Sequence, residues 1–116
     1  MGEAESGMKE SAYLTRLIVN WFNSHGHVAH RQNTVGVYDQ KRKVYRKNWD
    51  RDSVGVGDIL ICLKGGKWAE IEVKIGADRQ SYAQKKREIR VKAAGGVYAI
   101  VADWRDFLTL STGMKW

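Results

Sequence analysis

The stretch that most restricts how this chain can fold is residues 58–74, DILICLKGGKWAEIEVK, in which two alternating runs flank a pair of glycines. Side chains of a β-strand alternate between two faces, and glycines between two such runs are typical of a hairpin turn. We therefore predict a β-hairpin here. One face of its second strand is an apolar row, and the other face carries Trp68, Glu70, Glu72 and Lys74.

The face on which Asp58 lies depends on the length of the turn. A two-residue turn would place Asp58 opposite Val73, on the apolar face, whereas a three-residue turn, residues 64–66, places it opposite Glu72. We expect the three-residue turn, because Gly66 can adopt the left-handed conformation that commonly ends such turns and because the aliphatic side chains of both strands then share one face. Two carboxylates would then have Cβ atoms about 4.5 to 5.5 Å apart, where they repel unless one is protonated or a cation bridges them.

A divalent cation between these two acids would remove the repulsion. Mg²⁺ takes oxygen ligands and keeps several waters, so Asp58, Glu72 and a backbone carbonyl could hold it and leave positions open for a phosphate. Lys74 follows on the same face, about 6.6 Å further along the strand, where it could contact an attacking water or the scissile phosphate. The pattern favours phosphodiester hydrolysis. The alternative, a half-exposed strand with weak surface ion pairs, fits the spacing equally well.

Two helices are predicted by their spacing and by their end signals. The run YLTRLIVNWF has apolar residues on one helical face, which predicts a helix near 9–25 that ends at Gly26. A second helix is expected to begin after Ser81, a typical N-cap, and to end at Gly95 and Gly96.

The remaining segments complete a predicted α/β domain. We expect two short strands within 27–47, joined by a loop, and a strand at 97–102 that lies inside the sheet because it is apolar on both faces. Residues 104–110 predict a short final helix. The order of elements indicates a central mixed sheet flanked by helices.

The length of 116 residues indicates one domain, 1–116, in which we expect residues 1–7 to be a flexible amino-terminal segment. No apolar run approaches the roughly 20 residues of a membrane helix, and the polar start is unlike a signal peptide, so we expect a cytoplasmic protein. The single cysteine, Cys62, excludes an internal disulfide and is expected in the apolar core.

The charge balance favours a polyanionic partner. The chain has 20 Lys and Arg against 13 Asp and Glu, a net charge of +7, and nucleic acid is the commonest partner of such proteins. The segment 40–51 mixes basic residues with Tyr45 and Trp49, which suits binding to phosphates and unpaired bases, although a solvated strand edge would have a similar composition. The candidate DNA-binding residues of this segment are Lys41, Arg42, Lys43, Arg46 and Lys47. Two more, Lys85 and Lys86, lie in the helix expected after Ser81.

Several motifs together resemble a known nuclease family. The string from Gly57-Asp58 to Glu72-Val73-Lys74 is similar to the PD-(D/E)XK nuclease signature. The wider pattern, from about residue 8 to 105, resembles the virus-type replication-repair nuclease (VRR-NUC) family. The matching elements are the first helix with Glu10, the runs HRQN, GVGD and EIEVK, then Gln84 and the run AAGGVYAIV.

This resemblance implies a restriction-endonuclease-like αβββαβ core and a set of site residues. Asp58 and Glu72 would be metal ligands, the carbonyl of Val73 would complete the inner shell, and Lys74 would be the catalytic lysine. Further roles are implied outside the hairpin: Gln84 would organise the active site or the DNA backbone, Glu10 would position metal or water, and Arg31 and Asn33 would contact phosphate. Because Glu70 stands where the family more often has an apolar residue, the identity of the metal-binding glutamate stays open, with Glu72 favoured by its spacing from the lysine.

The implied activity is that of an Mg²⁺- or Mn²⁺-dependent DNA endonuclease of a bacterial or viral replication and repair system. Small members of the family act as homodimers that resolve four-way (Holliday) junctions, since two symmetric cuts suit a two-fold dimer. Two alternatives remain at this point. The chain could be a flap or duplex nuclease, or a non-catalytic basic DNA-binding module whose acids are structural.

Overall fold

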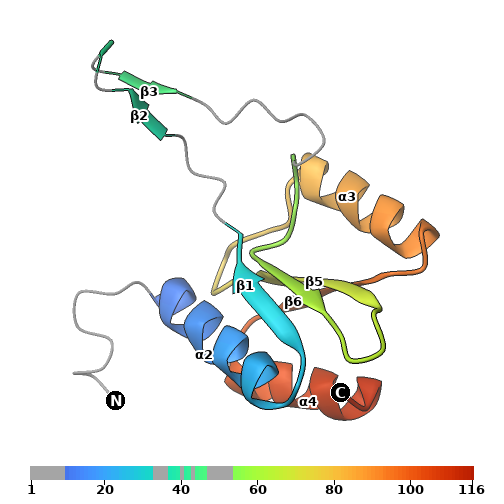
Figure 1. The fold of residues 1–116 in the computed structure, drawn as a ribbon. Helices are drawn as coiled ribbons and strands as arrows, with labels where there is room; N and C mark the ends of the chain where they lie inside the picture. Colours follow the sequence, from blue (N-terminus) through green and yellow to red (C-terminus); the bar gives the residue numbers. More distant parts are fainter. Residues whose placement is uncertain (1–9, 33–36, 40, 43, 47–53) are drawn as a thin grey trace.

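The computed structural model of this chain describes residues 10–32, 37–39, 41–42, 44–46 and 54–116. Four strands form a mixed sheet in the order β1-β4-β5-β6, in which only β5 and β6 are parallel, and β2 and β3 form a separate antiparallel pair. The prediction of a mixed α/β architecture is therefore confirmed (Figure 1). The elements are α2 (Glu10–Ser24), β1 (Val28–Arg31), β2 (Val37–Asp39), β3 (Val44–Arg46), β4 (Ile59–Cys62), β5 (Trp68–Val73), α3 (Tyr82–Ala93), β6 (Val97–Val101) and α4 (Trp104–Met114).

The β4–β5 hairpin has the predicted three-residue turn. The N–H of Leu63 donates to the carbonyl of Lys67 at 2.8 Å, and the N–H of Gly66, whose φ is 94°, donates to the carbonyl of Leu63 at 2.7 Å. A positive φ is readily adopted by glycine, which explains the Gly-Gly sequence of the turn. Continued to the other end of the strands, this register places Asp58 opposite Glu72.

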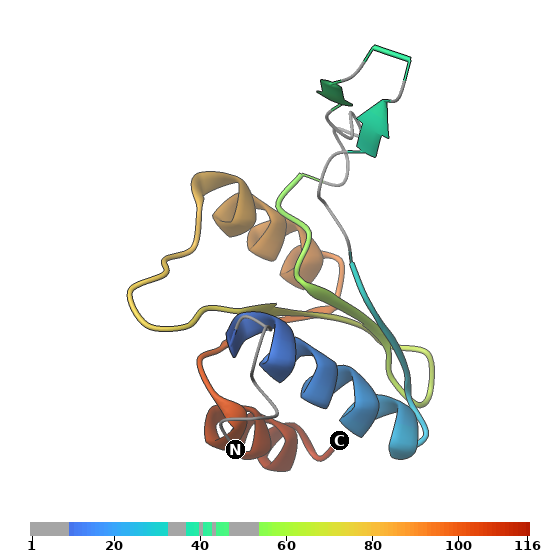
Figure 2. The same cartoon turned by 90° about the vertical axis from the view of Figure 1, so that its left-hand side faces the viewer.

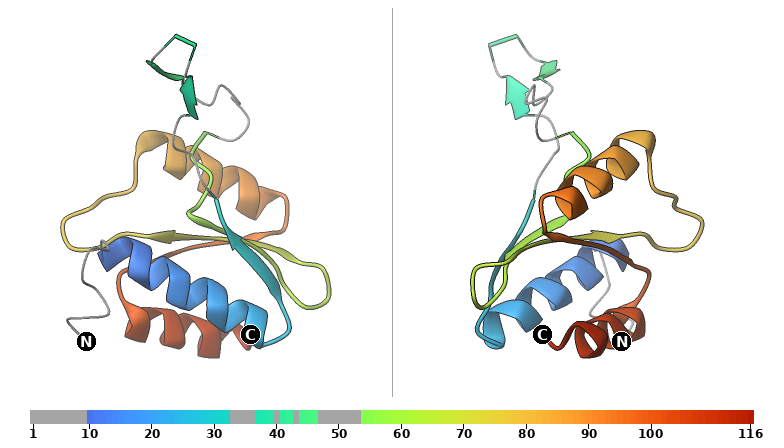
Figure 3. Two further views of the ribbon diagram at one scale, coloured as in Figure 1. Left: turned by 60° about the vertical axis from the view of Figure 1, so that its left-hand side comes forward. Right: turned by 90° about the vertical axis from the view of Figure 1, so that its right-hand side faces the viewer.

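The two faces of the four-stranded sheet are covered differently. Helices α2 and α4 lie side by side on one face, and α3 crosses the other (Figures 1 and 3). The apolar core fills the space below the sheet, against α2 and α4, and includes the aromatic rings of Phe22 and Phe107, whose centroids are 5.5 Å apart. Its main aliphatic members are Leu14, Ile18, Ile59, Ile61, Leu63, Ile71, Val73 and Val101.

The layer between the sheet and α3 is polar. Helix α3 buries only one of its residues, Val91. The strands below it present Glu70 and Glu72, both fully buried, and Tyr98, which is 4% exposed. Burial of charged groups is unfavourable unless they are paired or bonded, so the contacts of these side chains decide what this layer can do.

The helix ends follow their sequence signals. Helix α2 ends at Ser24, and Gly26 has a φ of 89°, as expected for its left-handed cap. Ser81 is the N-cap of α3, and Gly95, just beyond its C-terminal end, has a φ of 91°. The final helix, α4, is longer than predicted because it continues to Met114. None of the described helices is long and apolar enough to cross a bilayer.

Two expectations are wrong. Strand β6 lies at the edge of the four-stranded sheet as described, and its apolar side chains are explained by helices on both faces. Cys62 is exposed, since it pairs with Trp68, itself 46% exposed, on the face that α3 covers only in part. The second of the two short strands expected within 27–47 is confirmed as β3, which pairs with β2. Residues 1–7 lie outside the described ranges.

Candidate metal centre

Glu72 has one carboxylate oxygen without a hydrogen-bond partner. It lies in the second half of β5, fully buried, and its Oε1 accepts a 2.5 Å hydrogen bond from the hydroxyl of Tyr98. Its Oε2 is buried and has no partner among the described residues. Burial raises the pKa of Glu72, and the negative charges of Asp58 and Glu88 act in the same direction, whereas the Tyr98 hydrogen bond and the charge of Lys74 oppose the shift. A buried, half-satisfied carboxyl group of this kind is suited to a cation or a proton.

Asp58 is held close to Glu72 by the main chain of the next strand. It precedes β4, is half-buried, and its Oδ2 accepts a 2.7 Å hydrogen bond from the N–H of Val73. The other carboxylate oxygen makes no hydrogen bond to the residues that the structure describes. The hairpin thus brings together two carboxylates, each with one oxygen fixed by the protein and one without a hydrogen bond.

Glu70 differs from Glu72 in that both of its oxygens have partners. Arg87 donates to Oε2 from Nη2 at 2.6 Å and from Nε to both oxygens at 3.2 Å. The indole Nε1 of Trp68 donates to Oε2 at 2.8 Å, and the N–H of Gly57 donates to Oε1 at 3.1 Å. The hydrogen bonds between Arg87 and Glu70 raise the pKa of the Arg87 guanidinium. Glu70 is therefore occupied as the counter-ion of Arg87, which supports the choice of Glu72 as the metal-binding glutamate.

Gly57 is required by the close approach of its segment to β5. A Cβ atom at this position would lie 3.0 Å from the carbonyl oxygen of Ile71 and 3.2 Å from the Cβ of Glu70. The absence of a side chain allows the main chain just before Asp58 to reach the Glu70 carboxylate. The hydrogen bond from Gly57 therefore links the main chain next to Asp58 to the buried ion pair of Glu70 and Arg87.

Lys74 and Glu10 lie at the carboxyl end of β5. Lys74 directly follows the strand, is half-buried, and its N–H donates to the carbonyl of Val101 at 3.0 Å. Glu10 is exposed in the first turn of α2, which begins beside this end of β5 (Figures 2 and 3). Within the described residues, Glu10 makes no hydrogen bond or ion pair with Asp58 or Glu72.

Gln84 has a local structural partner. Its Oε1 accepts from the N–H of Ser81 at 2.7 Å, and its own N–H donates to the Ser81 hydroxyl at 3.1 Å. This reciprocal pair is a capping box, which satisfies two N–H groups at the start of α3. The side-chain amide N–H groups of Gln84 are left for another partner.

The candidate DNA-binding residues are only partly described. Arg31 is exposed at the end of β1, and Lys85 and Lys86 are exposed on α3, where the Lys86 ammonium lies 5.4 Å from the centre of the Tyr82 ring. Lys41 and Arg42 are exposed in the turn between β2 and β3. The candidates that lie outside the described residues, or of which only the backbone is described, are Asn33, Lys43, Arg46 and Lys47.

Two residues of the polar layer were missed by sequence reasoning. Tyr98 pairs with Glu70 across the parallel β5–β6 ladder, and its hydroxyl reaches Glu72 and, at 3.2 Å, the carbonyl of Gly55. Its signal was a single tyrosine within an otherwise aliphatic strand. Arg87 was one of several basic residues on the same helix, and nothing in its spacing distinguishes the one that pairs with Glu70.

The geometry limits how a cation could be held. Among the described residues, no three His, Cys, Asp or Glu side chains converge as a metal-binding group, so a cation would take side-chain ligands from two carboxylates. The comparisons with known proteins found no match, whether against family models, curated proteins or solved structures. The resemblance to the VRR-NUC family therefore stays a prediction that rests on the short motifs.

Proposed function

We propose that this protein is an Mg²⁺- or Mn²⁺-dependent DNA endonuclease that acts as a homodimer on four-way junctions, in the cytoplasm of a bacterium or of a virus-infected host. The observation that carries the proposal is the unpartnered, buried Oε2 of Glu72 beside Asp58. The order α2, β1, β4, β5, α3, β6 is compatible with the restriction-endonuclease-like core that the motifs imply. The net charge of +7 supports a nucleic-acid substrate.

The residues present fit a hard divalent ion. Carboxylates of Asp58 and Glu72 and the carbonyl of Val73 would hold it, because Mg²⁺ prefers oxygen ligands. When bound, the ion would make a coordinated water more acidic and neutralise charge on the phosphate. The unpaired oxygen of Glu72 gains a partner in this arrangement, which removes the penalty for leaving it buried and unbonded.

The other side chains of the site have separate roles in this proposal. The Val73 N–H fixes one Asp58 oxygen and the Tyr98 hydroxyl fixes one Glu72 oxygen, so both carboxylates are oriented before substrate binds. Lys74 would donate to a non-bridging oxygen of the scissile phosphate and stabilise the charge that develops there. Glu10, exposed at the start of α2, would position the attacking water.

A non-catalytic DNA-binding module is the second candidate, and one observation favours it. Both acids already accept one hydrogen bond from the protein, and the raised pKa of Glu72 allows it to be neutral without a cation. In that case the acids would only stabilise the fold. Phosphate contacts would still give strongly salt-dependent binding to DNA.

Cleavage of labelled four-way junction, flap and linear duplex DNA tests the two candidates. Each substrate is incubated with Mg²⁺, Mn²⁺, Ca²⁺ or EDTA, with wild type and with Asp58→Asn, Glu72→Gln and Lys74→Ala. The matched control is Lys67→Ala, an exposed lysine at the turn of the same hairpin. We expect paired symmetric nicks on the junction that disappear in EDTA and in the three site variants but not in the control.

The other outcomes are equally informative. Preferential cutting of the flap or the duplex would keep the site and change the substrate. Tight binding without cleavage under every metal condition would favour the binding module. Undiminished cleavage by the three site variants would refute the assignment of the site.

A further inference from the structure

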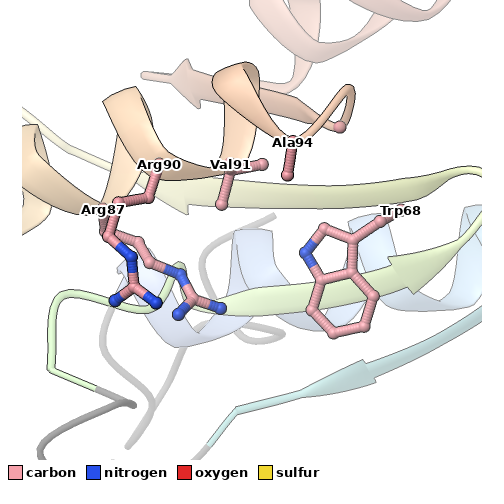
Figure 4. Close-up of a pocket in the computed structure, with 6 residues that line it drawn as sticks. Trp68, Arg87, Arg90, Val91 and Ala94 are labelled. Atoms are coloured by element: carbon pink, nitrogen blue, oxygen red, sulfur yellow. The ribbon is translucent and has the colours of Figure 1, made fainter.

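A hollow lies on the α3 side of the sheet, between the carboxyl-terminal half of α3 and the start of β5. It has a volume of about 280 Å³, and Figure 4 shows its wall of α3 side chains opposite the Trp68 indole. The volume is just below the range of about 300–1,000 Å³ typical of drug-sized ligands, so it suits one planar ring system. The lining residues are Trp68, Arg87, Arg90, Val91, Ala94 and Gly96.

The Trp68 ring is fixed in place although it is 46% exposed. Its Nε1 donates to Glu70 at 2.8 Å, and Glu70 is itself held by Arg87. Close packing beside Cδ1, the ring atom next to Nε1, depends on Gly96, where a Cβ atom would lie 2.9 Å from the Val91 side chain and 3.3 Å from Cδ1 of Trp68. A half-exposed indole that is held by a buried network offers a preformed flat surface.

Arg90 supplies a positive charge at the same hollow. It is exposed, and its guanidinium makes no hydrogen bond or ion pair with the described part of the chain. Its side chain extends from α3 in the same direction as that of Arg87, on the opposite side of the hollow from the indole (Figure 4). Because the Arg87 guanidinium pairs with Glu70, Arg90 is the arginine of this pocket that can take a new anionic partner.

We propose that this hollow binds an unpaired nucleotide of a DNA strand, with the base stacked on Trp68 and a neighbouring phosphate paired with Arg90. Aromatic rings beside basic side chains are the usual means of binding single strands, because every base has a flat face to stack. Trp68 and Glu72 lie on one face of β5, about 13 Å apart along the strand. The inference rests on the proposed nuclease function, in which the nucleotide would be one exposed near the branch point.

The test is binding without cleavage, measured in EDTA by fluorescence anisotropy. One labelled probe is a 12-nucleotide oligothymidylate, and the other is a strand of equal length and charge with abasic residues. We expect Trp68→Ala to weaken binding of the oligothymidylate about 5- to 150-fold, the range for loss of one stacked base, and to leave binding of the abasic strand unchanged. Trp68→Phe keeps an aromatic ring and should retain most of the affinity.

Arg90→Ala tests the phosphate contact. We expect it to weaken binding of both strands and to reduce the slope of the logarithm of affinity against the logarithm of salt concentration by about one. Arg105→Ala is the matched control, since Arg105 is an exposed arginine on α4, which covers the opposite face of the sheet. The control should bind both strands as wild type does.

Two results would overturn the inference. One is an unchanged ratio of the two affinities in Trp68→Ala, and the other is an equal loss in Trp68→Ala and Trp68→Phe, which would indicate the Glu70 hydrogen bond rather than stacking. The outcomes also separate this site from the nuclease proposal. Base-dependent binding at Trp68 without any DNA cleavage would keep the pocket and refute the nuclease, whereas junction cleavage without base-dependent binding would refute the pocket alone.

Discussion

At the scale of single residues, two neighbouring glutamates on one face of β5 differ in how many of their carboxylate oxygens have hydrogen-bond donors. Both oxygens of Glu70 accept hydrogen bonds, whereas only one oxygen of Glu72 does. Sequence alternation predicted that both would share a face with Trp68 and Lys74. It could not predict which one would be paired, because Arg87 reaches Glu70 from a helix 17 residues away.

Removing the charge of Glu70 should destabilise the protein, while removing that of Glu72 should not. Glu70→Gln leaves Arg87, whose side chain is 15% exposed, without its counter-ion, and we expect a loss of about 3 kcal/mol in the free energy of unfolding. Glu72→Gln removes no ion pair and should change stability by about 1 kcal/mol or less without metal. Urea denaturation in EDTA measures both, and the reverse order would contradict these assignments.

Addition of Mg²⁺ should stabilise the wild type through Glu72. A ligand at 100 times its Kd stabilises a protein that binds it only in the folded state by about 2.7 kcal/mol. We expect a rise in Tm with Mg²⁺ for wild type and for Glu70→Gln, and none for Glu72→Gln. An equal rise in Glu72→Gln would place the ion elsewhere.

His27 should make stability depend on pH. It is buried, and its Nδ1 accepts a 2.9 Å hydrogen bond from the N–H of Lys64. Burial, with the charge of Lys64, lowers the pKa of His27 below its usual 6.5. The unfolded chain therefore binds the proton first as pH falls, so the stabilisation is complete above about pH 6.5 and is lost as pH falls through the lower, folded-state pKa.

We expect His27→Gln, whose amide oxygen can accept the same hydrogen bond, to have a flatter profile of Tm against pH between about 7 and 5. The control is His30→Gln, since His30 is exposed on β1. Thermal denaturation over this pH range measures the difference. A profile for His27→Gln as steep as that of wild type would refute the role of this histidine.

At the scale of elements, the hairpin was predictable and the position of β6 was not. Two glycines and an alternating pattern fix the turn and the register locally, so the opposition of Asp58 and Glu72 followed from the sequence. The place of β6 at the edge of the sheet depends on which strands pair at long range. Apolar residues on both faces of β6 indicate that helices cover both sides of the strand. They do not indicate whether the strand lies at the centre or at the edge of the sheet.

Helix α3 allows the structural and functional roles of Gln84 to be separated. Ser81→Ala removes the N-cap and should cost about 1 kcal/mol in the free energy of unfolding. Gln84→Glu keeps the capping box, since glutamate also serves at this position, and should keep the Tm of wild type. If Gln84 also contacts the DNA backbone, as the family resemblance implies, the added negative charge should weaken DNA binding. Unchanged binding would leave Gln84 as a helix cap alone.

At the scale of the whole molecule, the sheet separates an apolar layer from a polar one. The side covered by α2 and α4 could be predicted from periodicity, because apolar spacing in the helices and strands matches. On the side covered by α3, alternation predicted the row of polar side chains on β5 but not the contacts that bury them, which are those of Glu70 with Arg87 and of Glu72 with Tyr98. Such long-range polar pairs leave no periodic signal in the sequence.

The proposed action on four-way junctions requires two sites in one particle. We expect sedimentation equilibrium at micromolar concentration to give twice the 13.2 kDa mass of the chain without DNA, and two chains per junction when junction DNA is present. A mixture of active and Lys74→Ala chains should then yield junctions nicked on one strand. A monomer at these concentrations would count strongly against a junction-resolving enzyme.

The contact of Gly57 with Glu70 has a consequence for how such a sequence can change over generations. A Cβ atom at position 57 would crowd the main chain of β5 at Ile71, and any loss of Glu70 would leave Arg87 without its counter-ion. Each substitution alone is therefore harmful, although Glu70 and Arg87 could be replaced together by an apolar pair while Gly57 is kept. Relatives of this chain should accordingly keep Gly57 and either keep both Glu70 and Arg87 or lack both, and those that lack the pair should be free to carry a residue other than tryptophan at position 68.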